Sequence, residues 1–155
     1  MSAWNNTTIE EVFLDVVEKL AFMFGEPCDA SEVSAESGVW SRASIRFHGD
    51  VSGVVSLSVP DELCLEIAEN ILGMDMGDVE DELEVGRDSL KEMLNVVCGH
   101  VVPVMQGEGS DVALDVPLLE SVSAAECVAA ASGDGVTAYN LDGSPVLLGF
   151  MLDEA

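Results

Sequence analysis

The chain has 155 residues, of which 48% are hydrophobic, and its 30 Asp and Glu against 5 Lys and Arg give a formal net charge of -25. This length fits one domain, residues 1–155, that is large enough to bury a core. The excess of acid argues against nucleic acid and anionic lipid as partners, because non-specific binding to either requires clustered Lys and Arg.

The predicted elements begin with a long helix and a hairpin. Thr7 and Thr8 are each followed three residues later by a glutamate, which is typical of a capping box. Apolar residues then recur at helical spacing, through Met23 and Phe24, until Gly25-Glu26-Pro27 interrupts them. Two β-rich runs at 39–48 and 51–59 flank a turn and predict a hairpin.

Two further helices are predicted in the middle of the chain. Pro60-Asp61-Glu62 is typical of a helix start and Gly73 of a helix end. After an acidic loop at 74–82, a second long helix begins at about Glu84, and Pro103 is expected to kink or end it. The apolar stripe of this helix consists of Leu90, Met93, Leu94, Val97, Val101 and, at its end, Val104.

Three short strands are predicted near the C-terminus, at 124–131, 136–141 and 145–152, separated by Gly-rich turns. The order of elements is therefore a helix, two strands, two helices and three strands. Such an order predicts an α+β fold, with a sheet on which the helices pack.

The cysteines and the N-terminal residues predict a cytoplasmic protein without a metal site. The four cysteines lie among apolar neighbours and form no Cys-x-x-Cys pair, which is typical of reduced, buried thiols. The first residues lack the basic and apolar regions of a secretory signal. No apolar run is long enough to span a membrane.

The second long helix carries a polar row opposite its apolar stripe. At about 100° per residue, Asp88, Glu92, Asn95 and Gly99 fall within about 40° of one line, whereas the stripe lies at about 140–240° from it. Gly99 has no side chain, so a partner can approach the helix closely there. The row therefore indicates a docking face. An ordinary solvated face of an acid-rich protein is the alternative.

Glu92 and Asn95 also have a specific chemical use. A carboxylate can pair with the ammonium group of a partner, and a carboxamide both accepts and donates hydrogen bonds. A carboxamide can thus hold a water molecule in line with an electrophilic phosphorus, and phosphoryl transfer depends mainly on such positioning. Neither side chain needs a metal ion of its own for this work.

At these residues the sequence resembles the chemotaxis phosphatases of the CheC, CheX and FliY type. In that family Asp or Ser is followed by Glu and Asn at the spacing of Asp88, Glu92 and Asn95, and later by a proline. The candidate proline is Pro117, 22 positions after Asn95 (117 - 95), which is one short of the usual family spacing.

The first long helix indicates which branch of the family the chain resembles. CheC-type members can carry two active helices, but the corresponding positions here are Glu18 and Ala21, without the carboxamide. The chain is therefore most similar to a CheX-like domain with a single site.

This resemblance implies a CheC/CheX-like α+β fold, with an antiparallel or mixed sheet and an exposed active-site helix. It implies a phosphatase that hydrolyses the phospho-aspartate of a CheY-like response regulator. Glu92 would pair with a lysine of the regulator and Asn95 would orient the attacking water, while Asp88 and Gly99 would contribute to docking. The magnesium ion would belong to the regulator, so no cofactor of the chain's own is expected.

The family resemblance further implies a homodimer. Two alternatives to the phosphatase stay open from the sequence. The first is a catalytically silent adaptor module in a chemotaxis or two-component signalling complex, which would bind a regulator irrespective of Asn95. The second is an acidic structural protein in which the row is a coincidence. Solubility and the steering of a basic partner both explain the acid excess, and the composition does not decide between them.

Overall fold

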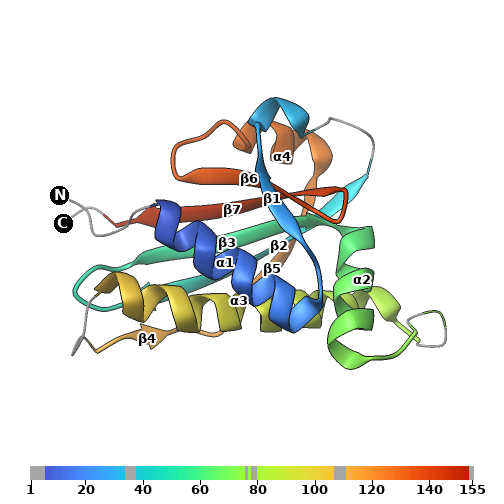
Figure 1. Ribbon diagram of the computed structural model, residues 1–155, viewed down its shortest axis with the longest axis horizontal. Coiled ribbons are helices and arrows are strands. Elements are labelled where there is room, and N and C mark those ends of the chain that lie inside the picture. Colours follow the sequence, from blue (N-terminus) through green and yellow to red (C-terminus); the bar gives the residue numbers. More distant parts are fainter. Residues whose placement is uncertain (1–5, 34–37, 76, 78–79, 107–110, 154–155) are drawn as a thin grey trace.

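The computed structural model describes residues 6–33, 38–75, 77, 80–106 and 111–153 (Figure 1). In chain order the elements are α1 (Asn6–Ala21), β1 (Gly25–Cys28), the short 3-10 helix η1 (Ala30–Glu32), β2 (Val39–His48), β3 (Gly53–Pro60), α2 (Asp61–Leu72), α3 (Glu82–Gln106), β4 (Ala113–Leu114), β5 (Leu118–Ser123), α4 (Ala124–Ala130), β6 (Val136–Leu141) and β7 (Ser144–Leu152).

The strands form one antiparallel sheet in the order β1-β6-β7-β3-β2-β4, and β5 pairs with β2 beside β4. Helices α1 and α3 lie along the sheet, and α2 packs beside α3 (Figure 1). This arrangement confirms the predicted α+β class. Among the described residues, no helix is long and apolar enough to cross a membrane.

The main core lies between the sheet and the three longer helices. Side chains of a strand alternate between its two faces, so Ala43, Ile45 and Phe47 of β2 are buried together with residues of α1, α2 and α3. A second apolar cluster, which includes Trp40 and Leu147, lies on the other sheet face beneath α4. The sheet thus separates α3 from α4.

The hairpin and α2 are confirmed close to their predicted limits. β2 pairs with β3 in a register that joins Trp40 to Pro60 and Phe47 to Gly53. α2 starts directly after Pro60. Proline fits this position because a backbone N–H here would have no acceptor within the helix. Gly73 ends α2 in the left-handed conformation, with φ of 69°, and its N–H donates to the carbonyl of Glu69.

The predicted limits of the first helix are wrong at both ends. The helix begins at Asn6, so Thr7 and Thr8 lie within its first turn rather than at a cap. It ends at Ala21, because Phe22 takes a left-handed conformation with φ of 56°. The residues expected to stop the helix instead form β1, a short edge strand in which a proline is tolerated.

The prediction of a strand at 124–131 is also wrong, because these residues form α4. Its first turn is capped by Ser123, whose Oγ accepts a hydrogen bond from the N–H of Glu126 at 3.1 Å. Two strands that the sequence did not predict precede this helix, the two-residue strand β4 and the strand β5. The strands predicted at 136–141 and 145–152 are confirmed as β6 and β7.

Candidate functional site

The predicted polar row lies on the exposed side of α3. Asp88, Glu92, Asn95 and Gly99 are all exposed, whereas Leu94 is fully buried. The orientation that the apolar spacing predicted is therefore confirmed over most of the helix. Only its C-terminal part differs, because Val104 is 59% exposed rather than part of the stripe. The buried residues of α3 are Gly86, Ser89, Leu90, Met93, Leu94, Val97, Cys98, Val101, Val102 and Met105.

The side chains of the row differ in their local partners. The carboxylate of Asp88 lies 3.3 Å from the ammonium nitrogen of Lys91 on the same helix. Within the described part of the chain, the carboxylate of Glu92 and the carboxamide of Asn95 have no hydrogen-bond or ion-pair partner. Both groups are therefore available to a molecule that docks on α3.

The N-terminal part of α3 is fixed by Arg87, the residue before Asp88. Its Nε donates to Ser41 Oγ at 3.0 Å and its Nη2 to Ser121 Oγ at 2.9 Å. The same guanidinium lies 3.5 Å from the carboxylate of Asp61, to which Ser41 donates at 2.7 Å. This half-buried network joins α3 to β2, β5 and α2. Charge-assisted hydrogen bonds of this kind are stronger than neutral ones.

The same part of α3 also packs very closely on α2. A Cβ atom added to Gly86 would lie 3.0 Å from the backbone carbonyl carbon and oxygen of Cys64. The close approach of the two helices therefore favours glycine here. Together with Arg87, this contact sets the rotation of α3 and keeps the row turned outward.

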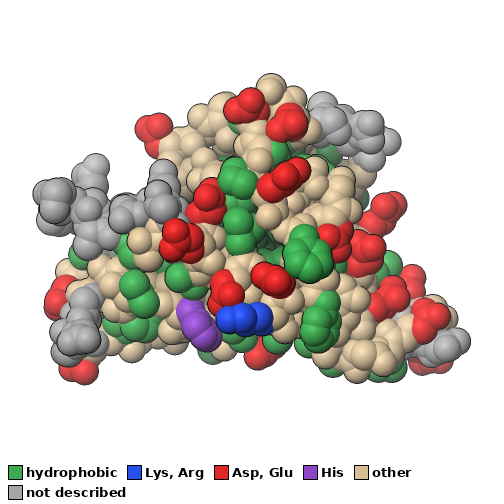
Figure 2. All heavy atoms as spheres, viewed as in Figure 1, with side chains coloured by type: hydrophobic (Ala, Val, Ile, Leu, Met, Phe, Trp, Pro, Cys, Tyr) green, Lys and Arg blue, Asp and Glu red, His purple; other side chains and the backbone are tan. Residues whose placement is uncertain are grey.

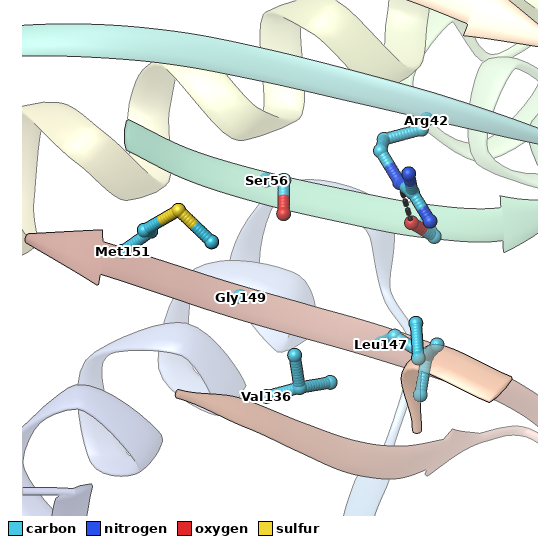
Figure 3. A pocket seen from close by; sticks show the side chains of 8 residues that line it. Arg42, Ser56, Val136, Leu147, Gly149 and Met151 are labelled. Atoms are coloured by element: carbon cyan, nitrogen blue, oxygen red, sulfur yellow. Dashed lines mark hydrogen bonds between the residues drawn. The ribbon is translucent and has the colours of Figure 1, made fainter. Parts of the chain in front are cut away.

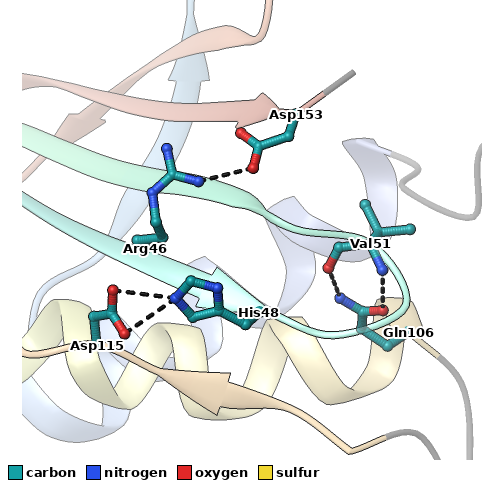
Figure 4. Close-up of polar contacts among 6 residues, drawn as sticks. All are labelled: Arg46, His48, Val51, Gln106, Asp115 and Asp153. Atoms are coloured by element: carbon teal, nitrogen blue, oxygen red, sulfur yellow. Dashed lines mark hydrogen bonds and ion pairs between the residues drawn. The ribbon is translucent and has the colours of Figure 1, made fainter. Parts of the chain in front are cut away.

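The C-terminal end of α3 is fixed to the turn between β2 and β3 (Figure 4). The side-chain amide of Gln106 forms two hydrogen bonds with the backbone of Val51. Its Oε1 accepts from the N–H of Val51 at 2.9 Å, and its Nε2 donates to the carbonyl oxygen of Val51. The helix is thus held at both ends, and the row lies between the two points of attachment.

The helix continues through Pro103 to Gln106, so of the two expected outcomes, a kink or an end of the helix at Pro103, the end is wrong. The bonds between Gln106 and Val51 help to explain why the last turn forms in spite of the proline. The candidate proline of the family signature, Pro117, is half-buried and lies between β4 and β5 rather than on α3.

The acid excess of the chain is not offset by free basic groups. Each of the five Lys and Arg residues lies within 4.0 Å of a carboxylate, and four of these pairs link residues other than the row. Figure 2 shows acidic side chains spread over the face that carries α1, where basic side chains are scarce. A partner therefore meets a negative potential as it approaches α3.

The first long helix does not repeat the site. Glu18 of α1 is exposed, but Ala21, at the position that corresponds to Asn95, is fully buried. Its side chain faces the core, so even a carboxamide there would not be presented to a partner. This geometry supports the expectation of a single site.

A hollow of about 200 Å³ lies on the sheet face opposite α3 and is lined by Arg42, Ser56, Gly149 and Met151, among others (Figure 3). Arg42 donates from Nε to Ser58 Oγ at 2.8 Å, so its guanidinium is already engaged. None of the row residues lines this hollow. The candidate site is accordingly separate from this hollow and lies on the exposed face of α3.

Thiol chemistry does not contribute to the row either. Burial raises the pKa of Cys98, the buried neighbour of Gly99, to about 12, so its thiol stays protonated at neutral pH. Among the described residues, no group of three or more His, Cys, Asp or Glu is arranged to hold a metal ion.

Comparison with known proteins identifies the fold and the family. The family model described as chemotaxis phosphatase CheX matches residues 42–138, which include α3 and its row. No curated protein is similar enough in sequence to match the chain.

Solved structures are similar over nearly the whole chain at low sequence identity. A CheX protein from Desulfovibrio desulfuricans has a TM-score of 0.68 at 14% identity and covers 95% of this chain and 97% of its own. The complex of CheX with CheY, BeF3 and Mg from Borrelia burgdorferi gives 0.67 at 17% identity, with 96% and 97% covered. A CheC-like superfamily protein from Shewanella sp. PV-4 gives 0.65 at 16% identity, with 97% and 100% covered.

Proposed function

The chain belongs to the CheX family of chemotaxis phosphatases, and we propose that it hydrolyses the phospho-aspartate of a CheY-like response regulator. The observation that carries the proposal is the pair Glu92 and Asn95. Both side chains are exposed and have no partner among the described residues, and they project from a helix that is held at both ends.

In the proposed reaction, Asn95 enters the active site of the regulator and orients the attacking water. Its carboxamide oxygen accepts a hydrogen bond from that water, while its NH2 group donates to an acceptor of the regulator. Positioning of this kind is sufficient for a large effect, because phosphoryl transfer requires little covalent chemistry from the protein. The magnesium ion stays with the regulator, and the chain contributes no cofactor of its own.

Glu92 has the complementary role of docking. Its carboxylate pairs with a lysine of the regulator, one turn of helix away from the water that Asn95 holds. The negative surface around α3 favours contact with that lysine and disfavours nucleic acid and anionic lipid. Asp88 has a smaller role, because Lys91 already pairs with its carboxylate.

The proposed partner is supported by the relative from Borrelia burgdorferi, which was crystallised as a complex of CheX with CheY. A catalytically silent adaptor with the same fold is the rival proposal, since a fold by itself does not fix activity. The adaptor would bind a regulator equally well with or without the Asn95 carboxamide. The phosphatase requires that carboxamide for turnover.

Homodimer formation also stays a prediction. The strand β5 pairs with β2 along one edge, and Leu118 at its start is 69% exposed. We propose that this exposed strand contributes to pairing of two copies. Sedimentation equilibrium would show a dimer mass if it does, and a monomer mass at all accessible concentrations would contradict the proposal.

The experiment that tests the phosphatase measures the loss of phosphate from a magnesium-bound, phosphorylated CheY-like regulator of the same cell. The protein is added as wild type, Asn95→Ala, Glu92→Ala and Glu18→Ala. Glu18→Ala is the matched control, because it removes an exposed glutamate from the other long helix. Circular dichroism establishes that every variant is folded.

The proposal predicts acceleration by wild type and by Glu18→Ala. It predicts that Asn95→Ala still binds the regulator but loses the acceleration, and that Glu92→Ala loses both affinity and rate. Binding without acceleration by wild type would favour the adaptor. Equal acceleration by wild type and Asn95→Ala would contradict the role assigned to the carboxamide.

A further inference from the structure

The proline inside α3 leaves one backbone acceptor without its regular helical donor. In an α-helix the carbonyl oxygen of residue i accepts from the N–H of residue i+4. The donor for the carbonyl oxygen of Gly99 would be residue 103, which is a proline and has no N–H. α3 nevertheless continues for three residues beyond Pro103, so this break lies within the helix rather than at its end.

This acceptor lies on the side of α3 that carries the row. Gly99 and Pro103 are both exposed, and Gly99 follows Asn95 by four residues, which places it one turn further along the same face. Among the described residues, a Cβ atom added to Gly99 would meet no atom within 4 Å, so the space beside its backbone is open to that extent. The missing side chain and the missing amide proton therefore occur at one place, next to Asn95.

A side-chain nitrogen already reaches a backbone carbonyl in this part of the helix. Nδ1 of His100 lies 2.9 Å from the carbonyl oxygen of Val96. For the Gly99 carbonyl, by contrast, the regular helical donor is missing, because residue 103 is a proline. The Gly99 oxygen is thus the better acceptor for a donor that comes from outside the chain.

We propose that the Gly99 carbonyl oxygen accepts a hydrogen bond from a lysine or arginine of the response regulator, in addition to the lysine that pairs with Glu92. This inference rests on the proposed function, because it names a second contact at the same site. A cationic donor fits best, since Asp88 and Glu92 lie on the same face and the chain has a net charge of -25. Pro103 is then a positioning residue, which keeps the acceptor free.

The proposal is tested with Pro103→Ala, which restores an amide proton that can bond the Gly99 carbonyl. Slow hydrogen exchange of the amide at position 103 would establish that the acceptor is now occupied. Removal of an interior proline favours the helix, so the melting temperature should not fall. Loss of binding in this variant would therefore not result from unfolding.

The binding probe is the magnesium- and BeF3-bound CheY-like regulator, measured by calorimetry. Pro103→Ala should weaken its binding roughly two- to tenfold, as expected for the loss of one hydrogen bond. Phosphate release at saturating concentration should be unchanged, because Asn95 is untouched. Val104→Ala is the matched control, since it alters the exposed neighbour of Pro103 and leaves the proline in place. Its affinity should equal that of wild type.

The outcomes separate this inference from the proposed function. Unchanged affinity in Pro103→Ala, with a protected amide at position 103, would overturn the inference and leave the phosphatase proposal intact. If Pro103→Ala binds the regulator more weakly but wild type releases no phosphate, the phosphatase proposal would be overturned and the contact at the Gly99 carbonyl supported. No binding by wild type would overturn both. As a direct readout, the carbonyl carbon of Gly99 should change its NMR shift when the regulator binds.

Discussion

Two glycine-to-alanine substitutions within α3 should change stability in opposite directions. Alanine is favoured over glycine inside a helix by roughly 0.5–1 kcal/mol. At Gly99 the added methyl group meets no atom of the described part of the chain within 4 Å, so Gly99→Ala should increase the free energy of unfolding by about that amount. The outcome at Gly86 differs because its surroundings are closed.

At Gly86 the added Cβ would lie 3.0 Å from two backbone atoms of Cys64 and 3.1 Å from its Cβ. Backbone inside the buried contact between α2 and α3 cannot rotate away as a side-chain end can. Overpacking of this kind costs roughly 1–3 kcal/mol. The gain in helix propensity is common to both substitutions, so the difference between the two variants should equal this packing cost.

The assay is thermal unfolding followed by circular dichroism, with urea unfolding as a check that the denaturant slope is unchanged. For a chain of this length, 1 kcal/mol corresponds to about 2–4 °C. Gly86→Ala should therefore melt roughly 2–12 °C below Gly99→Ala. Equal melting temperatures, or a higher one for Gly86→Ala, would refute the close packing of α3 on α2 and with it the assigned rotation of the helix.

Two further predictions concern the buried side of α3. Leu94→Ala should cost roughly 2–5 kcal/mol, because this leucine is fully buried, whereas the exposed Asn95→Ala should cost little; similar losses in thermal unfolding would contradict the orientation of the row. Burial raises the pKa of Cys98 from 9.0 to about 12, so its contribution to stability is fully present below pH 9 and is lost as pH rises toward 12. At pH 10.5 ionisation of this thiol in the unfolded chain lowers the free energy of unfolding by about 2 kcal/mol. Between pH 8 and 10.5 the Cys98→Ala variant should therefore lose less unfolding free energy than the wild type does, and equal losses would count against a buried neutral thiol.

Elements with strong local signals could be predicted from the sequence. The hairpin of β2 and β3 is predictable because apolar and polar residues alternate along its strands. The helix α2 is predictable because a proline stands at its start and Gly73 at its end, and both act within a few residues. α4 was missed although Ser123 and Glu126 carry a helix-start signal, because seven residues with Val and Cys at their centre do not show a helical period. Short helices depend on packing more than on periodicity.

The ends of α1 illustrate a different limit. Met23 and Phe24 continue the apolar pattern of the helix, yet Met23 is buried while Phe24 is 71% exposed. The chain turns at Phe22 because Phe24 pairs with Asp142, whose backbone N–H donates to the carbonyl of Phe24 and whose carboxylate accepts from its N–H. That contact joins residues far apart in the sequence, so no local pattern could reveal it.

Some features of the candidate site also follow from the local sequence, and others depend on contacts with distant residues. Glu92, Asn95 and Gly99 could be placed on one exposed face because the period of a single helix fixes their direction. The groups that hold this helix in place could not, because Arg87 and Gln106 act through β2, β5 and the turn at Val51. Only Arg87 carries a signal in the sequence, because it is one of just five Lys and Arg residues in a chain with 30 Asp and Glu.

The attachment of α3 at both ends has a consequence for recognition. A helix whose two termini are fixed has lost most of its conformational freedom during folding, so a docking partner need not order it again. The rise of about 1.5 Å per residue then sets Glu92 and Asn95 about 4.5 Å apart along the axis before any encounter. The separation of the two residues is therefore fixed before binding. If the pair acts as proposed, it selects a partner whose cation and reactive phosphorus have a matching separation, and this selectivity follows from geometry that the free protein already possesses.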